Sequence, residues 1–184
     1  MSAATLPYLM TVAEFLAWDP PDAGDRWELI DGQPVAMAPP RARHALIAAE
    51  TSRLLGNHLV DHPRCRVATE AGVKPDDYNL RIPDLSVTCE TLTPDDLLLR
   101  EPVLIIEILS PTNARDTRAA AVRYMTIPSV QEILLLHSAE MRADLLRRQP
   151  DIAWARLTLE AEDAVELASI GFSAPVAAFY RTAA

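Results

Sequence analysis

Residues Pro102 to Pro111 read PVLIIEILSP, and this stretch decides how the middle of the chain folds. From Val103 to Leu109 every residue is apolar except Glu107. A short apolar run between prolines is typical of a strand buried on both faces. An ionised carboxylate in an apolar interior is strongly unfavourable unless something compensates its charge. We therefore expect either that the strand is exposed at this point or that Glu107 meets a cation.

Length and composition favour a single globular domain over residues 1–184. Of the 184 residues, 49% are hydrophobic and 23% are charged, an ordinary balance for a protein with a sizeable core. No apolar run approaches the ~20 residues of a membrane span, and the N-terminus lacks a signal-peptide pattern. Cys65 and Cys89 are too few for a disulfide framework, which favours a reducing, cytoplasmic location.

The formal net charge of −9 opposes long-range attraction to nucleic acid. A nucleic-acid role therefore requires a local basic patch. Lys74 is the single lysine of the sequence, and all other basic residues are arginines. A lysine-dependent chemistry thus has one candidate.

Hydrophobic periodicity predicts a mixed α/β (α+β) fold, with a central sheet flanked by helices. Helices are predicted over residues 11–18, 41–60, 114–124 and 175–180, the first from a capping-box pattern. A hairpin is predicted over 27–38, turning at Asp31-Gly32. Further strands are predicted over 66–73, 84–89, 103–109 and 132–136, followed by two exposed meander strands over 141–148 and 153–160.

Two carboxylates indicate the candidate chemistry. Asp84 follows Pro83 and opens one predicted strand, and Glu107 lies within the next. If these strands are neighbours, both side chains can face one point. Two carboxylates with backbone and water oxygens are ligands that Mg²⁺ or Mn²⁺ prefers, and such an ion would compensate Glu107. The alternative is a purely structural role, in which Asp84 accepts a hydrogen bond in a turn and Glu107 pairs with a buried arginine.

The order and spacing of several motifs resemble one known family. The motifs are WELIDG (27–32), a turn leading to His44, RIPDLSV (81–87), PVLIIEILSPTN (102–113), Asp116, Tyr124 and SVQEILLL (129–136). Together they resemble the Uma-type putative restriction endonuclease family of the PD-(D/E)xK nuclease-like superfamily. The resemblance implies a restriction-endonuclease-like core, Mg²⁺ or Mn²⁺ at Asp84 and Glu107, and DNA as substrate.

The same resemblance adds Glu28 and His44 to the candidate catalytic residues. Glu28 matches the glutamate of the family's ELIDG motif, and His44 matches its long-helix histidine. Glu28 could equally be a solvated strand residue, and a lone helical histidine is more often a packed or surface residue. His44 within reach of the site could orient a water or a phosphate.

The chain departs from the family at its lysine. The superfamily places that lysine where Leu109 stands, and the Uma-type family places it where Ala120 stands. Arg123 and Lys74 are candidate substitutes. An arginine can bind phosphate through two parallel hydrogen bonds but stays protonated, so it predicts weaker chemistry.

Two main hypotheses follow. The first is a divalent-metal-dependent DNA endonuclease, weakened by loss of the lysine, which acts as a homodimer because enzymes that cut both strands usually pair. The second is a catalytically inactive nuclease-fold protein with a binding, assembly or regulatory role. A binder of proteins with no nucleic-acid role is a weaker third hypothesis.

Overall fold

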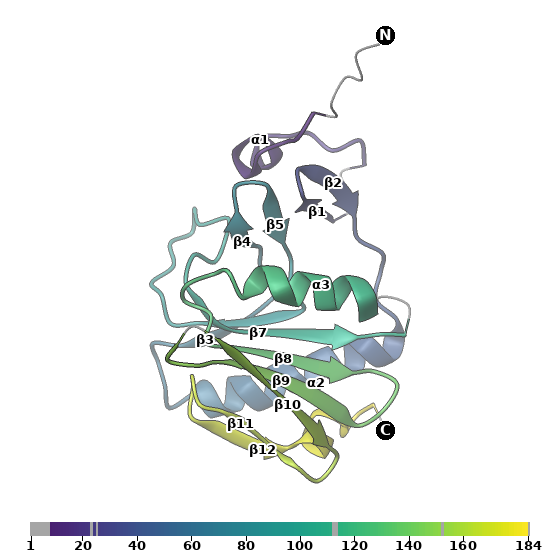
Figure 1. Ribbon diagram of the computed structural model, residues 1–184, viewed down its shortest axis with the longest axis vertical. Coiled ribbons are helices and arrows are strands. Elements are labelled where there is room, and N and C mark those ends of the chain that lie inside the picture. The colour runs from purple at the N-terminus through teal and green to yellow at the C-terminus, as the bar shows by residue number, and fades with distance from the viewer. Residues whose placement is uncertain (1–7, 23, 25, 112–113, 152, 184) are drawn as a thin grey trace.

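The computed structural model describes residues 8–22, 24, 26–111, 114–151 and 153–183 (Figure 1). The helices are α1 (Val12–Leu16), α2 (Ala42–Leu59), α3 (Ala114–Tyr124) and the 3-10 helix η1 (Val176–Tyr180). The strands are β1 (Trp27–Ile30), β2 (Gln33–Ala36), β3 (Arg66–Thr69), β4 (Val73–Asp76), β5 (Asn79–Arg81), β6 (Leu85–Thr88), β7 (Pro102–Leu109), β8 (Glu132–His137), β9 (Arg142–Arg148), β10 (Trp154–Glu160), β11 (Ala164–Leu167) and β12 (Phe172–Pro175).

The largest sheet has six strands in the order β10-β9-β8-β7-β6-β3. Strands β7 and β8 run parallel, while the other neighbouring pairs of this sheet are antiparallel. Parallel neighbours need a crossover connection, and α3 lies in that connection. A second sheet has the order β2-β1-β5-β4, and β11 pairs with β12 in a separate hairpin.

Strand β7 separates two apolar cores because its side chains alternate between the two faces of the sheet. Leu104, Ile106 and Ile108 belong to the core that includes residues of α2, whereas Ile105 and Leu109 belong to the core that includes residues of α3. Figure 1 accordingly shows α2 and α3 on opposite sides of the large sheet. The predicted mixed sheet flanked by helices is confirmed.

Two elements that were predicted from local sequence signals are confirmed, the capping box of α1 and the β1–β2 hairpin. Thr11 accepts the backbone N–H of Glu14, and the Glu14 carboxylate accepts the backbone N–H of Thr11, so the capping box forms at α1. The β1–β2 hairpin turns at Asp31 and Gly32, with φ values of 47° and 75°. A Cβ at Gly32 would lie 2.8 Å from the Cβ of Leu9, so this turn needs glycine.

The prediction of an exposed strand over 141–148 was wrong for most of β9, which is largely buried. The strand lies between β8 and β10, and Ala143 and Leu145 join the same core as Val165 and Tyr180. The C-terminal hairpin and η1 thus contribute to the core that buries β9. The sequence analysis did not predict β4, β5, β11 or β12. The single strand predicted over 66–73 was wrong beyond Thr69, because β3 ends there and Val73 begins β4 in the smaller sheet. The prediction of an exposed strand over 153–160 is confirmed by β10.

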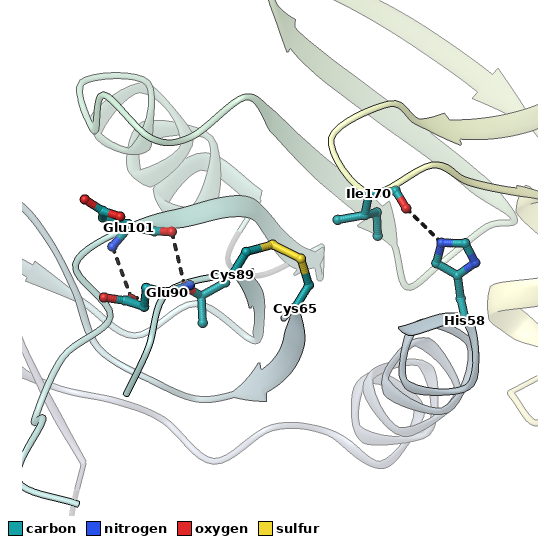
Figure 2. The surroundings of a disulfide bond; sticks show 7 residues. His58, Cys65, Cys89, Glu90, Glu101 and Ile170 are labelled. Carbon is teal, nitrogen blue, oxygen red and sulfur yellow. Dashed lines mark hydrogen bonds between the residues drawn. A yellow bond between two sulfur atoms is a disulfide. The ribbon is translucent and has the colours of Figure 1, made fainter. Parts of the chain in front are cut away.

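The structure changes the interpretation of the cysteines. Cys65 and Cys89 form a disulfide beside the point where β3 and β6 pair (Figure 2). A single disulfide is still too few for a disulfide-stabilised fold. Because the two cysteines are bonded to each other, they no longer favour a reducing location. Within the described part of the chain, no helix has the length and hydrophobicity needed to cross a membrane.

Candidate active site

Asp84 lies directly before β6 and beside β7. The antiparallel register pairs Leu85 with Ile106, which places Asp84 and Glu107 one step further along the same two strands. Asp84 Oδ2 accepts the backbone N–H of Ile108 over 2.7 Å. This bond ties the Asp84 side chain to β7, so the two predicted metal-site carboxylates lie on neighbouring strands.

Glu107 shares the side of the sheet that faces α3. The hydroxyl of Tyr124 donates a hydrogen bond to Glu107 Oε1 over 2.7 Å. Burial and the nearby Asp84 carboxylate raise the pKa of Glu107 well above its usual range, although the bond from Tyr124 opposes this rise. Burial and Glu107 also raise the pKa of Tyr124. The lone glutamate of the apolar strand is thus only partly compensated, and a cation beside Asp84 would stabilise its ionised form.

His44, in the first turn of α2, completes the contacts of Asp84. His44 Nε2 lies 3.1 Å from Asp84 Oδ2. Because a carboxylate oxygen accepts hydrogen bonds, this contact places a ring hydrogen on Nε2. Nδ1 is buried and has no hydrogen-bond partner among the described residues. His44 therefore orients Asp84 and has one ring nitrogen left over.

Glu28, on β1, is buried and uses both carboxylate oxygens. Oε1 accepts the backbone N–H of Ile82 over 2.7 Å, and Oε2 lies 3.2 Å from Arg81 Nη2. Burial raises the pKa of Glu28, and the Asp84 carboxylate adds to this, whereas Arg81 and the Ile82 N–H oppose it. These contacts make Glu28 a partner of Arg81.

The four predicted site residues line one pocket of about 810 Å³. Its walls include residues from both of the larger sheets and from α2 and α3. Besides Asp84, Glu107, Glu28 and His44, four arginines line it: Arg26, Arg41, Arg43 and Arg81. Carboxylates of Glu28, Glu70, Asp84, Glu107 and Asp116 line it as well, so the pocket carries charges of both signs.

The two candidate substitutes for the family lysine lie elsewhere. The Arg123 guanidinium contacts the carboxylates of Asp31 and Asp76, and Lys74 Nζ lies 2.7 Å from Asp77 Oδ1. Neither side chain is among the described residues that line the pocket. The positions of the family lysine are apolar and buried, since Leu109 and Ala120 belong to the core beside α3.

Arg81 and Tyr124 contact the candidate carboxylates, and the sequence analysis did not include them among its candidate site residues. Arg81 stands three residues before Asp84, but the chain passes from the smaller sheet into the larger one between them. Tyr124 stands four residues after Ala120, on the same face of α3. Both residues belong to the motifs RIPD and Asp116–Tyr124, which is the signal that could have identified them.

The donor set fits a hard divalent cation with water in its coordination shell. Among the described residues, no group of three or more His, Cys, Asp or Glu side chains is arranged to enclose a metal. Mg²⁺ keeps several waters and is commonly bound by one or two carboxylates, which Asp84 and Glu107 can supply. A closed four-ligand zinc site does not fit this set.

Comparison with known proteins agrees with this architecture. The family Uma2, described as a putative restriction endonuclease, matches residues 12–177. An uncharacterized protein of Synechocystis is 32% identical over 172 residues, which cover 91% of this chain and 90% of that protein. The crystal structure of a putative nuclease from Anabaena variabilis has a TM-score of 0.79 at 19% identity, over 95% of this chain and 99% of that one, which shows a shared fold. The chain therefore belongs to the Uma2 family of putative restriction endonucleases.

Proposed function

We propose that this protein is a divalent-metal-dependent nuclease that hydrolyses phosphodiester bonds of DNA. The observation that carries the proposal is the pairing of Asp84 with Glu107 in one pocket, where burial and Asp84 raise the pKa of Glu107. Membership of a family described as restriction endonucleases supports the same conclusion.

Asp84 and Glu107 would hold Mg²⁺ or Mn²⁺. Such an ion, when bound, polarises a phosphoryl oxygen and lowers the pKa of a water. The other residues act on these carboxylates: the Ile108 N–H and His44 orient Asp84, and Tyr124 orients Glu107. Contacts from β7, α2 and α3 thus hold the two carboxylates in place.

DNA as the substrate is supported by the arginines of the pocket. Arg26, Arg41 and Arg43 lie at its wall, and Arg41 and Arg43 flank the start of α2. Arginine side chains bind phosphate oxygens and position a nucleic acid without reading its sequence. Arg41 and Arg43, exposed at the pocket wall, would supply the local positive charge that DNA binding by a protein of net charge −9 requires.

The proposal extends to organisation and location. The pocket takes residues from both of the larger sheets, which supports one functional domain over residues 1–184. We propose a homodimer, because nucleases that cut both strands of a duplex usually act in pairs. A cytoplasmic location remains our prediction, and the Cys65–Cys89 disulfide argues against it. Thiol alkylation before cell lysis tests the location: a labelled pair supports the cytoplasm, and a protected pair contradicts it.

The second candidate function is a non-enzymatic nuclease-fold protein that binds DNA or assists assembly. The buried, apolar Leu109 and Ala120 favour it, because a lysine is missing at both positions. Nicking of supercoiled plasmid in Mg²⁺ or Mn²⁺ distinguishes the two. We expect slow nicking by the parent protein and none by Asp84→Asn or Glu107→Gln. No nicking by folded parent protein that binds Mn²⁺ would favour the second function.

A further inference from the structure

Arg81 is the most enclosed cation of the pocket, with 9% of its surface exposed. It ends β5, and Asp84 precedes β6 after a short connection through Ile82 and Pro83. This connection therefore brings a guanidinium and a carboxylate of the site into the same pocket. Arg81 at the end of β5 and Asp84 directly before β6 are each held by a strand, which keeps both groups in fixed positions.

The contacts of Arg81 satisfy only part of its guanidinium. Nη2 lies 3.2 Å from Glu28 Oε2. Nε is buried and has no hydrogen-bond partner among the described residues. A buried donor of a charged group that lacks a partner is costly, so the contact with Glu28 leaves the guanidinium only partly satisfied.

The other arginines of the pocket are held differently. Arg26 forms an ion pair with Glu70, and Arg41 and Arg43 are exposed at the start of α2. Charges in an enclosed, poorly solvated position stabilise an anion more strongly than exposed charges do. Arg81 is thus the arginine best placed to act on a reacting phosphate.

We infer that Arg81 is a catalytic residue whose guanidinium binds the scissile phosphate of a DNA backbone. This inference rests on the proposed nuclease function. The guanidinium offers parallel N–H donors to two phosphate oxygens and stabilises the charge that develops on them. It transfers no proton, because it stays protonated. Glu28 is then a positioning residue, since its Oε2 contacts Nη2 of the guanidinium.

Five proteins test this inference: the parent, Arg81→Gln, Arg81→Lys, the double variant Glu28→Gln/Arg81→Gln, and Arg118→Gln. The double variant removes both members of the buried ion pair, so it keeps the test valid if Arg81→Gln alone does not fold. Arg118→Gln is the matched control, because Arg118 is exposed on α3 and outside the residues that line the pocket.

The first readout is plasmid nicking in Mn²⁺. We expect Arg81→Gln and the double variant to lower kcat by about 10²–10³, the usual cost of one lost transition-state donor. Arg81→Lys should retain more activity than Arg81→Gln, and Arg118→Gln should match the parent. Parental kcat in a folded Arg81→Gln protein or in the double variant would overturn the inference.

The second readout needs no cleavage and separates this inference from the proposed function. Anisotropy of a fluorescein-labelled 20-base-pair duplex in Ca²⁺ is measured at several salt concentrations. Loss of one phosphate contact should reduce the slope of log K against log salt by about 0.9 in Arg81→Gln, with no change in Arg118→Gln. An unchanged slope in Arg81→Gln overturns the phosphate contact. Lack of cleavage by a parent protein whose slope depends on Arg81 overturns the nuclease function alone.

Glu28 is tested by Glu28→Gln, which keeps an acceptor for the Ile82 N–H but loses the charge that holds Arg81. We expect kcat to fall with KM nearly unchanged, because Arg81 then samples unproductive positions. A purely structural role would lower the melting temperature and the active fraction, but not kcat per active site.

Discussion

The hydroxyl of Tyr124 donates a 2.7 Å hydrogen bond to Glu107 and so links α3 to the central strand β7. This bond makes the pKa of Glu107 lower than burial and Asp84 alone would make it. Tyr124→Phe should raise the pKa of Glu107 further and weaken Mn²⁺ binding near neutral pH. The variant should also lose about 0.5–1.5 kcal/mol of stability.

Mn²⁺ titrations followed by melting temperature test the role of Tyr124. The exposed Tyr78→Phe is the matched control, and it should leave both quantities unchanged. Equal Mn²⁺ affinity of Tyr124→Phe and the parent at every pH would contradict the link between this bond and the ion.

Glu107 should make metal-free protein less stable as the pH rises. Its pKa is raised by burial and by Asp84, so its contribution to stability is complete below the unfolded pKa of about 4.3 and is lost as the pH rises through the folded pKa. Glu107→Gln, which stays neutral, should lose less stability over this interval than the parent. Melting curves of both proteins in chelator at a series of pH values measure the difference.

Added Mn²⁺ should reverse this order at high pH, because ligand binding to the folded state stabilises it. The parent should then melt higher than in chelator, and Glu107→Gln should not respond. A Mn²⁺ shift of the same size in both proteins would show that the ion binds elsewhere.

Ala120→Lys should restore part of the nicking that Arg81→Gln loses. Ala120 and Tyr124 share one face of α3, and Tyr124 contacts Glu107, so a lysine at 120 points its ammonium toward the site. Ala120 is only 2% exposed, and the larger side chain should therefore destabilise the protein by about 1–3 kcal/mol.

The control for this suppression is Ala120→Met in the Arg81→Gln background, which adds similar bulk without a charge. Restored nicking with lysine but not with methionine supports a shared electrostatic role for positions 81 and 120. Restoration that survives Asp84→Asn would instead indicate a contaminating nuclease.

Reduction of the Cys65–Cys89 disulfide should destabilise the protein. The bridge spans a sequence separation of 24 residues, and closure of a loop of that size in the unfolded chain corresponds to about 3 kcal/mol. Tris(2-carboxyethyl)phosphine should therefore lower the melting temperature by on the order of 10 °C. The double variant Cys65→Ser/Cys89→Ser should melt at the lower temperature with or without reductant. A parent protein insensitive to reductant would contradict the bridge's contribution.

The sequence predicted those features that depend on short segments. The capping box at Thr11, the turn at Asp31-Gly32 and the helix over 114–124 each have local signals, and each formed as predicted. The proximity of Asp84 and Glu107 required only that their two strands be neighbours, which they are.

The remaining features depend on long-range pairing. Arg123 stands three residues after Ala120 on α3, yet its guanidinium turns to Asp31 and Asp76, which lie in the turn after β1 and at the end of β4. Arg81 joins the pocket only because β5 pairs with β1, where Glu28 lies. The burial of β9 similarly depends on a C-terminal hairpin with no strong local signal. The local sequence pattern around a residue does not indicate which distant residues will lie beside it in the fold.

The location of a bound ion tests the central claim most directly. Crystals soaked in Mn²⁺ and measured at the manganese absorption edge should give one anomalous peak between the carboxylates of Asp84 and Glu107. Its distance from an oxygen of each should be on the order of 2 Å. The peak should be absent in Asp84→Asn crystals treated in the same way. A strong peak away from both carboxylates, or no peak in the parent protein, would contradict the proposal that this pocket is a metal-dependent nuclease site.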